Sequence, residues 1–233
     1  MDMGKTKANP REWQHKWGNK SHRENYLNTV NFEGNKWIPC SISIFPAVWA
    51  KYREKLKAIA VKHPFVFGTW IKHKRNFDNI PDWHKANSFH VDNWGCKWHV
   101  AQGGYEGQVI EHPLADWEDF ETYEFPDPAK QDERRDRKWG EWFFNRLEMF
   151  FAKKSGVHVS GSGGRLFDRL YFLRGFDNLM MDFAYEHPKH QKLLDKFEAH
   201  KIARTKKVLK TRPDTVSYHT DIGTQDRLMI KPS

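Results

Sequence analysis

The feature that most restricts the fold of this chain is an alternation of strand-like and helix-like segments. β-rich stretches occur at 37–45, 90–99, 108–112, 157–160 and 215–219. Between them lie segments that read as helices, because their apolar residues recur at helical spacing or because residues typical of helix starts begin them. These segments are 47–62, 127–154, 166–185 and 188–211. Strands that alternate with helices are typical of parallel α/β proteins. The sequence therefore predicts an α/β fold, with a hairpin-like excursion at the glycine-rich 103–107 segment.

Composition limits the class of protein and the number of domains. No run of about 18 apolar residues occurs, which argues against a membrane-spanning helix. Aromatic residues make up 15% of the chain, too many for a disordered polymer. The 233 residues fit one large domain or two small ones. Because no Pro/Ser-rich linker is present, we expect a polar, basic segment over 1–22 followed by one domain over 23–233.

The net charge of +9 is distributed by segment. Residues 105–136 carry eleven acids and three bases, whereas residues 186–212 carry nine bases and three acids. This pattern favours solvated helix faces or an anionic small-molecule ligand, and we expect neither a nucleic-acid nor a membrane partner. Cys40 and Cys96 form no CxxC pair, and the N-terminus has no apolar signal region. A cytoplasmic protein is expected, with a homodimer as one expected assembly.

Three places could carry chemistry, because working residues in parallel α/β folds lie at the carboxyl ends of strands. Asp92 lies among aromatic residues, where it is either a carboxylate that faces a ligand or a hydrogen-bonded turn residue. The 161–164 glycine run predicts a βα turn, with or without an anion on its N–H groups. The 219–225 segment either forms a polar surface that contacts a substrate or is an ordinary turn rich in turn-forming residues.

The sequence contains no clear motif for a metal site or for a hydrolase active site. His90, His99 and His112 lack the spacing of a zinc ligand set. The chain also has no GxSxG motif, which argues against a Ser-His-Asp hydrolase. No metal site is therefore predicted within these residues.

Several segments, in order along the chain, resemble the broad uroporphyrinogen decarboxylase family, which includes corrinoid-linked methyltransferase-like proteins. The matching stretches are RENYLNTVNF (23–32), DNWGCKW (92–98), GQVIEHPLADW (107–117), FPDP (125–128), LRGFDNLMM (173–181) and DIGTQDRLMIKPS (221–233). The resemblance implies a TIM (β/α)8-type barrel, of which this chain would hold about the first five strands. The strand at 215–219 would be left with an open edge, so we also expect a fragment of a longer protein.

The resemblance further implies a carboxy-lyase that removes carboxylate from a tetrapyrrole or a related small molecule, without a cofactor. Asp92 and Asp221 would be catalytic, with Asp92 facing pyrrole N–H groups. The expected substrate-binding residues are Trp94, Gly163, His219, Thr220, Gly223 and Gln225. The arginine-bearing N-terminal motif of the decarboxylases is absent, although an arginine would orient acetate groups.

Two alternatives accompany this prediction. One is a zinc-dependent methyltransferase of the same superfamily that moves a methyl group between a corrinoid protein and a thiol. Its zinc ligands would lie beyond Ser233. The other is a non-catalytic porphyrinoid-binding protein.

Overall fold

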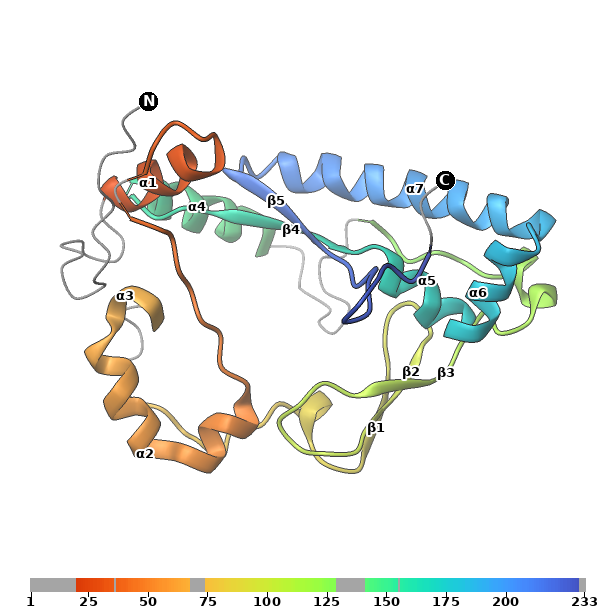
Figure 1. Ribbon diagram of the computed structural model, residues 1–233, viewed down its shortest axis with the longest axis horizontal. Helices are drawn as coiled ribbons and strands as arrows, with labels where there is room; N and C mark the ends of the chain where they lie inside the picture. The colour runs from red at the N-terminus through yellow and green to blue at the C-terminus, as the bar shows by residue number, and fades with distance from the viewer. Residues whose placement is uncertain (1–19, 36, 68–73, 129–140, 155, 231–233) are drawn as a thin grey trace. The chain divides into compact units, whose positions relative to one another are not determined.

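A computed structural model describes residues 20–35, 37–67, 74–128, 141–154 and 156–230 (Figure 1). The chain divides into two compact units, each built from separate chain segments. Unit 1 comprises 1–86, 102–105 and 142–159, and unit 2 comprises 87–101, 106–141 and 160–233. The predicted polar segment over 1–22 lies largely outside the described residues.

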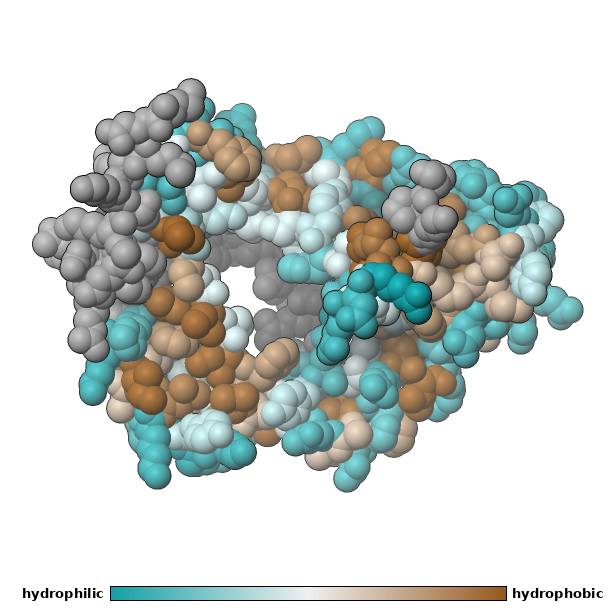
Figure 2. All heavy atoms as spheres, viewed as in Figure 1, coloured by the Kyte–Doolittle hydropathy of each residue, from teal (hydrophilic) through white to brown (hydrophobic). Residues whose placement is uncertain are grey.

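Unit 1 is helical in its described residues. Its elements are α1 (Lys20–Val30), α2 (Pro46–Lys62), α3 (Pro64–Phe67), the 3-10 helix η3 (Asp82–His84) and most of α4 (Glu141–Lys154). Pro46 begins α2 at a position where a missing N–H costs nothing, as the sequence predicts. A small core forms around Trp49, Ala60 and Phe77. Hydrophobic side chains also gather at the surface over α2 and α3 (Figure 2), and Ile59 is one of them.

Unit 2 holds the strands. β1 (Ser88–Val91), β2 (Lys97–Val100) and β3 (Gln108–Glu111) form an antiparallel sheet in that order. β4 (Ser160–Arg165) and β5 (Thr215–His219) form a separate parallel pair. The connection between them consists of α5 (Phe167–Arg174), α6 (Phe176–Ala184) and α7 (Pro188–Leu209). The 3-10 helix η4 (Trp117–Glu121) follows β3.

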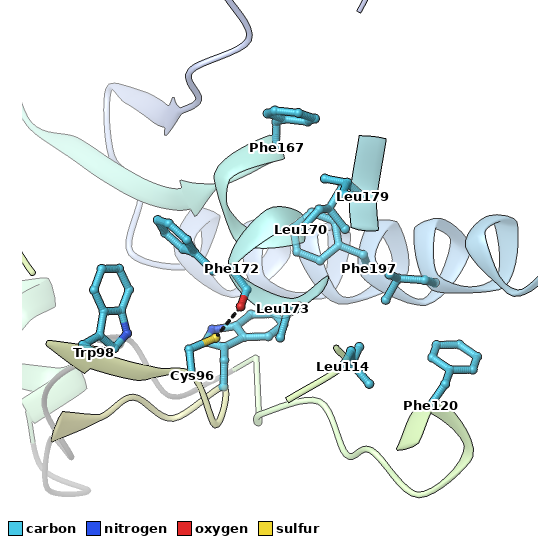
Figure 3. Close-up of a cluster of buried hydrophobic side chains, with 12 residues drawn as sticks. Cys96, Trp98, Leu114, Phe120, Phe167, Leu170, Phe172, Leu173, Leu179 and Phe197 are labelled. Atoms are coloured by element: carbon cyan, nitrogen blue, oxygen red, sulfur yellow. Dashed lines mark hydrogen bonds between the residues drawn. The ribbon is translucent and has the colours of Figure 1, made fainter. Parts of the chain in front are cut away.

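The buried core of unit 2 joins these elements (Figure 3). Cys96, directly before β2, and Trp98 of β2 pack with Leu170, Leu173 and other side chains of α5. Leu193 and Phe197 of α7 complete the cluster together with Leu114 and Phe120, which follow β3. Burial of large aromatic side chains is the main source of stability in such a core.

The predicted TIM-type barrel is wrong. Among the described residues only β4 and β5 pair in parallel, and the other sheet is antiparallel. The 37–45 stretch predicted as the first strand is irregular in its described residues. Pro39 within it cannot donate to a ladder, and Ile38 and Ile42 are exposed. A pattern of β-rich runs therefore did not reveal which runs pair, or in which direction.

The glycine-rich run predicted as a turn is instead part of strand β4. A Cβ at Gly161 would overlap the Val208 side chain on α7, and one at Gly163 would overlap the Tyr218 ring on β5. At Gly161 the neighbouring side chain is buried, and at Gly163 it is a partly exposed ring, so glycine is more strictly required at Gly161.

We expect Gly161→Ala to destabilise unit 2 by about 1–3 kcal/mol, the usual cost of overpacking a core. Val208 is β-branched, 5% exposed and held on a helix, so it cannot move aside easily. Gly163→Ala is the matched control, since Tyr218 is 40% exposed and its ring can rotate outward. Urea denaturation measures both, and equal losses would contradict the role assigned to Val208.

Candidate functional site

An open cleft with a volume of about 460 Å³ lies within unit 2. Its size falls in the range of about 300–1,000 Å³ that is typical of small-molecule sites. Four of the ten lining residues carry a Trp, Tyr or Phe ring, and four others are polar or charged. The lining residues are Trp98, Glu106, Gly107, Gln108, Val109, His112, Arg165, Tyr171, Phe172 and Phe176.

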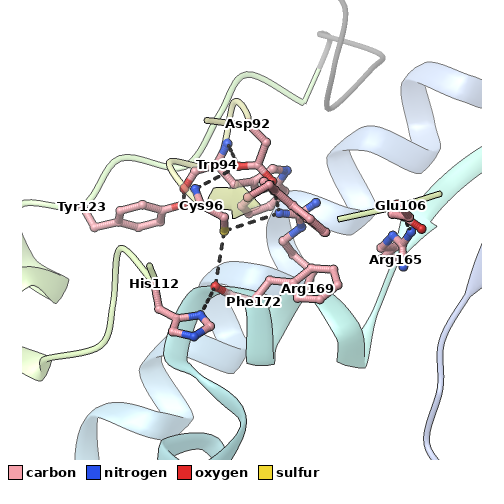
Figure 4. A network of polar contacts seen from close by, with 10 residues as sticks. Asp92, Trp94, Cys96, Glu106, His112, Tyr123, Arg165, Arg169 and Phe172 are labelled. Carbon is pink, nitrogen blue, oxygen red and sulfur yellow. Dashed lines mark hydrogen bonds and ion pairs between the residues drawn. The ribbon is translucent and has the colours of Figure 1, made fainter. Parts of the chain in front are cut away.

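Arg165 is the last residue of β4, so its side chain lies at the carboxyl end of the parallel pair. Its Nη2 donates to Glu106 Oε1 at 2.7 Å, and its guanidinium carbon lies 5.5 Å from the centre of the Phe172 ring (Figure 4). Asp168 Oδ2 is 3.7 Å from Nη1. The cleft therefore has a planar cation held against an aromatic face, a geometry suited to carboxylates.

His112 contributes a titratable ring to the same cleft. Its Nδ1 lies 2.8 Å from the carbonyl oxygen of Phe172. A carbonyl only accepts, so Nδ1 carries the proton in this arrangement. That bond fixes the ring and leaves Nε2 as the atom available for proton transfer. Gly175 lies beside the ring, because a Cβ there would be 3.6 Å from Nε2.

Tyr171 borders the cleft from α5. Burial raises the pKa of Tyr171 to about 12, and the nearby carboxylate of Asp168 adds to the shift. An unfolded tyrosine titrates near about 10. Between these two values the folded protein binds more protons than the unfolded chain. The contribution to stability is therefore complete below the unfolded pKa and is lost as pH rises towards the folded pKa.

We expect wild-type stability to fall between pH 9 and 11.5 more steeply than that of Tyr171→Phe. The phenylalanine variant lacks the ionisable group, so its stability should change less over the same interval. Denaturant titrations at several pH values measure this, with the ultraviolet absorbance of tyrosinate followed alongside. Parallel pH profiles for the two proteins would contradict the assignment.

Asp92 lies in the core of unit 2, where several hydrogen-bond donors surround its carboxylate (Figure 4). Its Oδ1 accepts from the backbone N–H groups of Trp94 and Cys96 at 3.0 and 2.9 Å. Its Oδ2 accepts from Trp98 Nε1 at 3.1 Å and pairs with Arg169 Nη1 at 2.7 Å. The side chains of Arg169 and Asp92 are 0% and 2% exposed. This carboxylate thus closes the turn before β2 and holds α5 to the sheet.

Trp94, predicted to bind substrate, is also a core residue. It is buried and packs at 5.6 Å against Phe125 and at 6.1 Å against Phe197, measured between ring centres. Its carbonyl accepts from the Tyr123 hydroxyl at 2.8 Å. Neither Asp92 nor Trp94 is among the residues that line the cleft.

The predicted 219–225 residues lie at the carboxyl end of β5 and beyond it. His219 pairs with Arg165 in the parallel register. Thr220 Oγ1 accepts from the backbone N–H of Phe167 at 3.2 Å, and the backbone N–H of Asp221 donates to Asp168 Oδ1 at 2.9 Å. The exposed residues Gly223 and Gln225 follow, with Gly223 in a bridge to Leu228. Asp168 thus contacts both Asp221 and the Arg165 side chain.

Sequence reasoning did not select Arg165, Glu106 or Tyr171, and it considered His112 only as a metal ligand. Arg165 follows the glycine run directly, so its place at a strand end was the available signal. Among the described residues, no group of three or more His, Cys, Asp and Glu side chains is placed to hold a metal ion. None of the described helices is both long and apolar enough to cross a membrane.

Comparison with known proteins identified no matching family model, no similar curated protein and no similar solved structure. The function of the cleft is therefore argued from its own chemistry.

Proposed function

We propose that the protein binds a carboxylated, pyrrole-containing small molecule in the unit 2 cleft and acts on it as a carboxy-lyase, with a tetrapyrrole or related compound as substrate. The observation that carries the proposal is the Arg165 guanidinium above the Phe172 ring, in a cleft that also contains further aromatic rings and His112. Aromatic walls fit the face of a pyrrole ring, and a guanidinium fits its acidic side arms.

Three stretches that resemble the decarboxylase family also pack together, which supports the proposal. Cys96, from the first stretch, donates through Sγ to the Phe172 carbonyl at 3.3 Å. His112, from the second, contacts that same carbonyl, and Leu114 N donates to the carbonyl of Leu173 at 2.9 Å. The third stretch begins at Leu173. Residues about 60–80 positions apart in the chain thus meet at Phe172, which lines the cleft.

The chemistry requires one bound carboxylate and one proton donor. When an acetate arm loses its carboxylate, the carbon–carbon bond breaks and its electron pair remains on the arm carbon while CO₂ leaves. A proton then bonds to that carbon, so the net change replaces carboxylate by hydrogen. Arg165 would hold a neighbouring carboxylate that is not lost. His112, when protonated at Nε2, would supply the proton.

The test is anaerobic incubation of the chain with uroporphyrinogen, with CO₂ and products of lower carboxylate number as the readout. We expect Arg165→Gln to weaken binding about tenfold or more, because a charge-assisted bidentate contact is lost. His112→Gln should retain binding and lose turnover. Lys192→Gln, which removes an exposed cation of α7, is the matched control.

The outcomes separate the hypotheses. Binding that depends on Arg165 without turnover would favour the non-catalytic porphyrinoid-binding protein. Turnover that Arg165→Gln and His112→Gln leave unchanged would refute the assignment of this cleft.

A further inference from the structure

The Arg165 guanidinium is already engaged by a carboxylate of the protein itself. We infer that Glu106 occupies the ligand-carboxylate position in the unliganded cleft, so that a ligand carboxylate must displace it to reach Arg165. The inference rests on the proposed function. It adds a determinant of affinity to the same site.

The geometry of the pair resembles a bound ligand. Glu106 Oε1 lies 2.7 Å from Arg165 Nη2, and both residues line the cleft. Among the described residues that line it, Arg165 is the one permanently charged cation. A ligand carboxylate that enters the cleft therefore meets an arginine that pairs directly with Glu106 and that buried Asp168 also faces. It would also be repelled by Glu106 unless that side chain moves away.

Displacement of Glu106 is energetically feasible. The Arg165 and Glu106 side chains are 27% and 35% exposed. Exposed ion pairs contribute little net stability, and this pair is only partly shielded. A departing Glu106 carboxylate would also regain hydration at the open cleft.

Arg165 would keep its position when Glu106 leaves. Its backbone belongs to β4, its guanidinium rests above Phe172, and Asp168 lies 3.7 Å from the other terminal nitrogen. Gly107 fixes the chain beside Glu106, since a Cβ there would lie 2.7 Å from the carbonyl oxygen of His99. A ligand carboxylate can thus replace Glu106 when the Glu106 side chain rotates away, and β3 does not have to move.

The competition lowers the affinity of every ligand whose carboxylate must reach Arg165. A group tethered within the same molecule acts at an effective concentration of about millimolar or more. Each such ligand therefore meets the same cost of displacing Glu106, whatever its number of carboxylates.

The experiment compares the wild type with Glu106→Gln, which retains the shape of the side chain but loses its charge. The probes are uroporphyrin, with eight carboxylates, and phenylacetate, with one, each titrated by calorimetry. We expect Glu106→Gln to tighten the binding of both probes about fivefold, the change that about 1 kcal/mol produces. Glu111→Gln is the control: it removes an equal charge from exposed β3, outside the cleft lining.

Each other outcome has a distinct meaning. Uroporphyrin binding that is unchanged or weaker in Glu106→Gln would overturn the inference, while the proposed function would stand if Arg165→Gln still weakened binding. Equal tightening in Glu106→Gln and Glu111→Gln would also overturn it, as a general charge effect. No binding of either probe by the wild type or by Glu106→Gln would overturn both.

Discussion

The Asp92→Asn variant should lose about 3–5 kcal/mol of unfolding free energy, the usual cost of breaking a buried ion pair. The substitution keeps the shape of the side chain but leaves the Arg169 guanidinium, 0% exposed, without its negative partner. The guanidinium also lies over the Trp94 and Phe172 rings, at 5.1 and 5.4 Å from their centres. These apolar surroundings cannot replace the lost carboxylate.

Urea denaturation followed by tryptophan fluorescence measures this loss. Asp226→Asn, at an exposed position after β5, is the matched control and should change stability by less than about 0.5 kcal/mol. The double variant Asp92→Asn/Arg169→Met should recover part of the loss, since no charge then remains buried. If Asp92→Asn kept full stability but lost turnover, the predicted catalytic role of Asp92 would be favoured instead.

A second large effect is expected for Arg174→Gln, again about 3–5 kcal/mol. Arg174 is the last residue of α5, and its Nε donates to Asp182 Oδ2 on α6 at 2.8 Å. Its Nη1 donates to the carbonyls of Leu114 and Ala115, and its guanidinium carbon lies 4.1 Å from the Trp117 ring centre. One side chain therefore joins α5 to α6 and to the segment after β3.

Glutamine is too short to reach these partners together, and it leaves the Asp182 carboxylate buried without its cation. Thermal and urea denaturation measure the effect, with the exposed Arg227→Gln as control. The double variant Arg174→Gln/Asp182→Asn should be less destabilised than the sum of the single changes, because the pair is coupled. Strict additivity would contradict this account.

Individual helices and strands were predictable because the residues that set their ends lie within a few positions of those ends. The predicted 188–211 helix corresponds to α7, and the predicted 47–62 helix corresponds to α2, each with a proline at its start. The predicted strand over 215–219 has the same bounds as β5. Proline geometry and side-chain period act over a few residues, so they can be read from the chain directly.

Strand pairing could not be predicted in the same way. The residues of β1 and β2 are close in sequence and pair antiparallel, whereas β4 and β5 pair in parallel across three helices. β5 has a β-rich sequence like those of the antiparallel strands, whereas β4 (SGSGGR) does not. The direction of pairing depends on packing between distant segments, such as the contact between Gly161 and Val208, and no local pattern encodes it.

The cleft was missed for a related reason. Arg165 and Glu106 are 59 positions apart and meet only in the folded unit. Asp92, by contrast, attracted attention as an aspartate among aromatic residues. Its partner Arg169 is 77 positions away, so the sequence alone did not show that the carboxylate is neutralised.

The interleaved segments of the two units limit how the molecule can be dissected. The chain passes from one unit to the other after residues 86, 101, 105, 141 and 159. No single cut yields either unit with all of its segments, so a truncated version would carry unpaired core surface from both. Autonomous expression of unit 2 would require rejoining three pieces of polypeptide, and co-translational folding must wait until Arg169 has left the ribosome before Asp92 finds its partner.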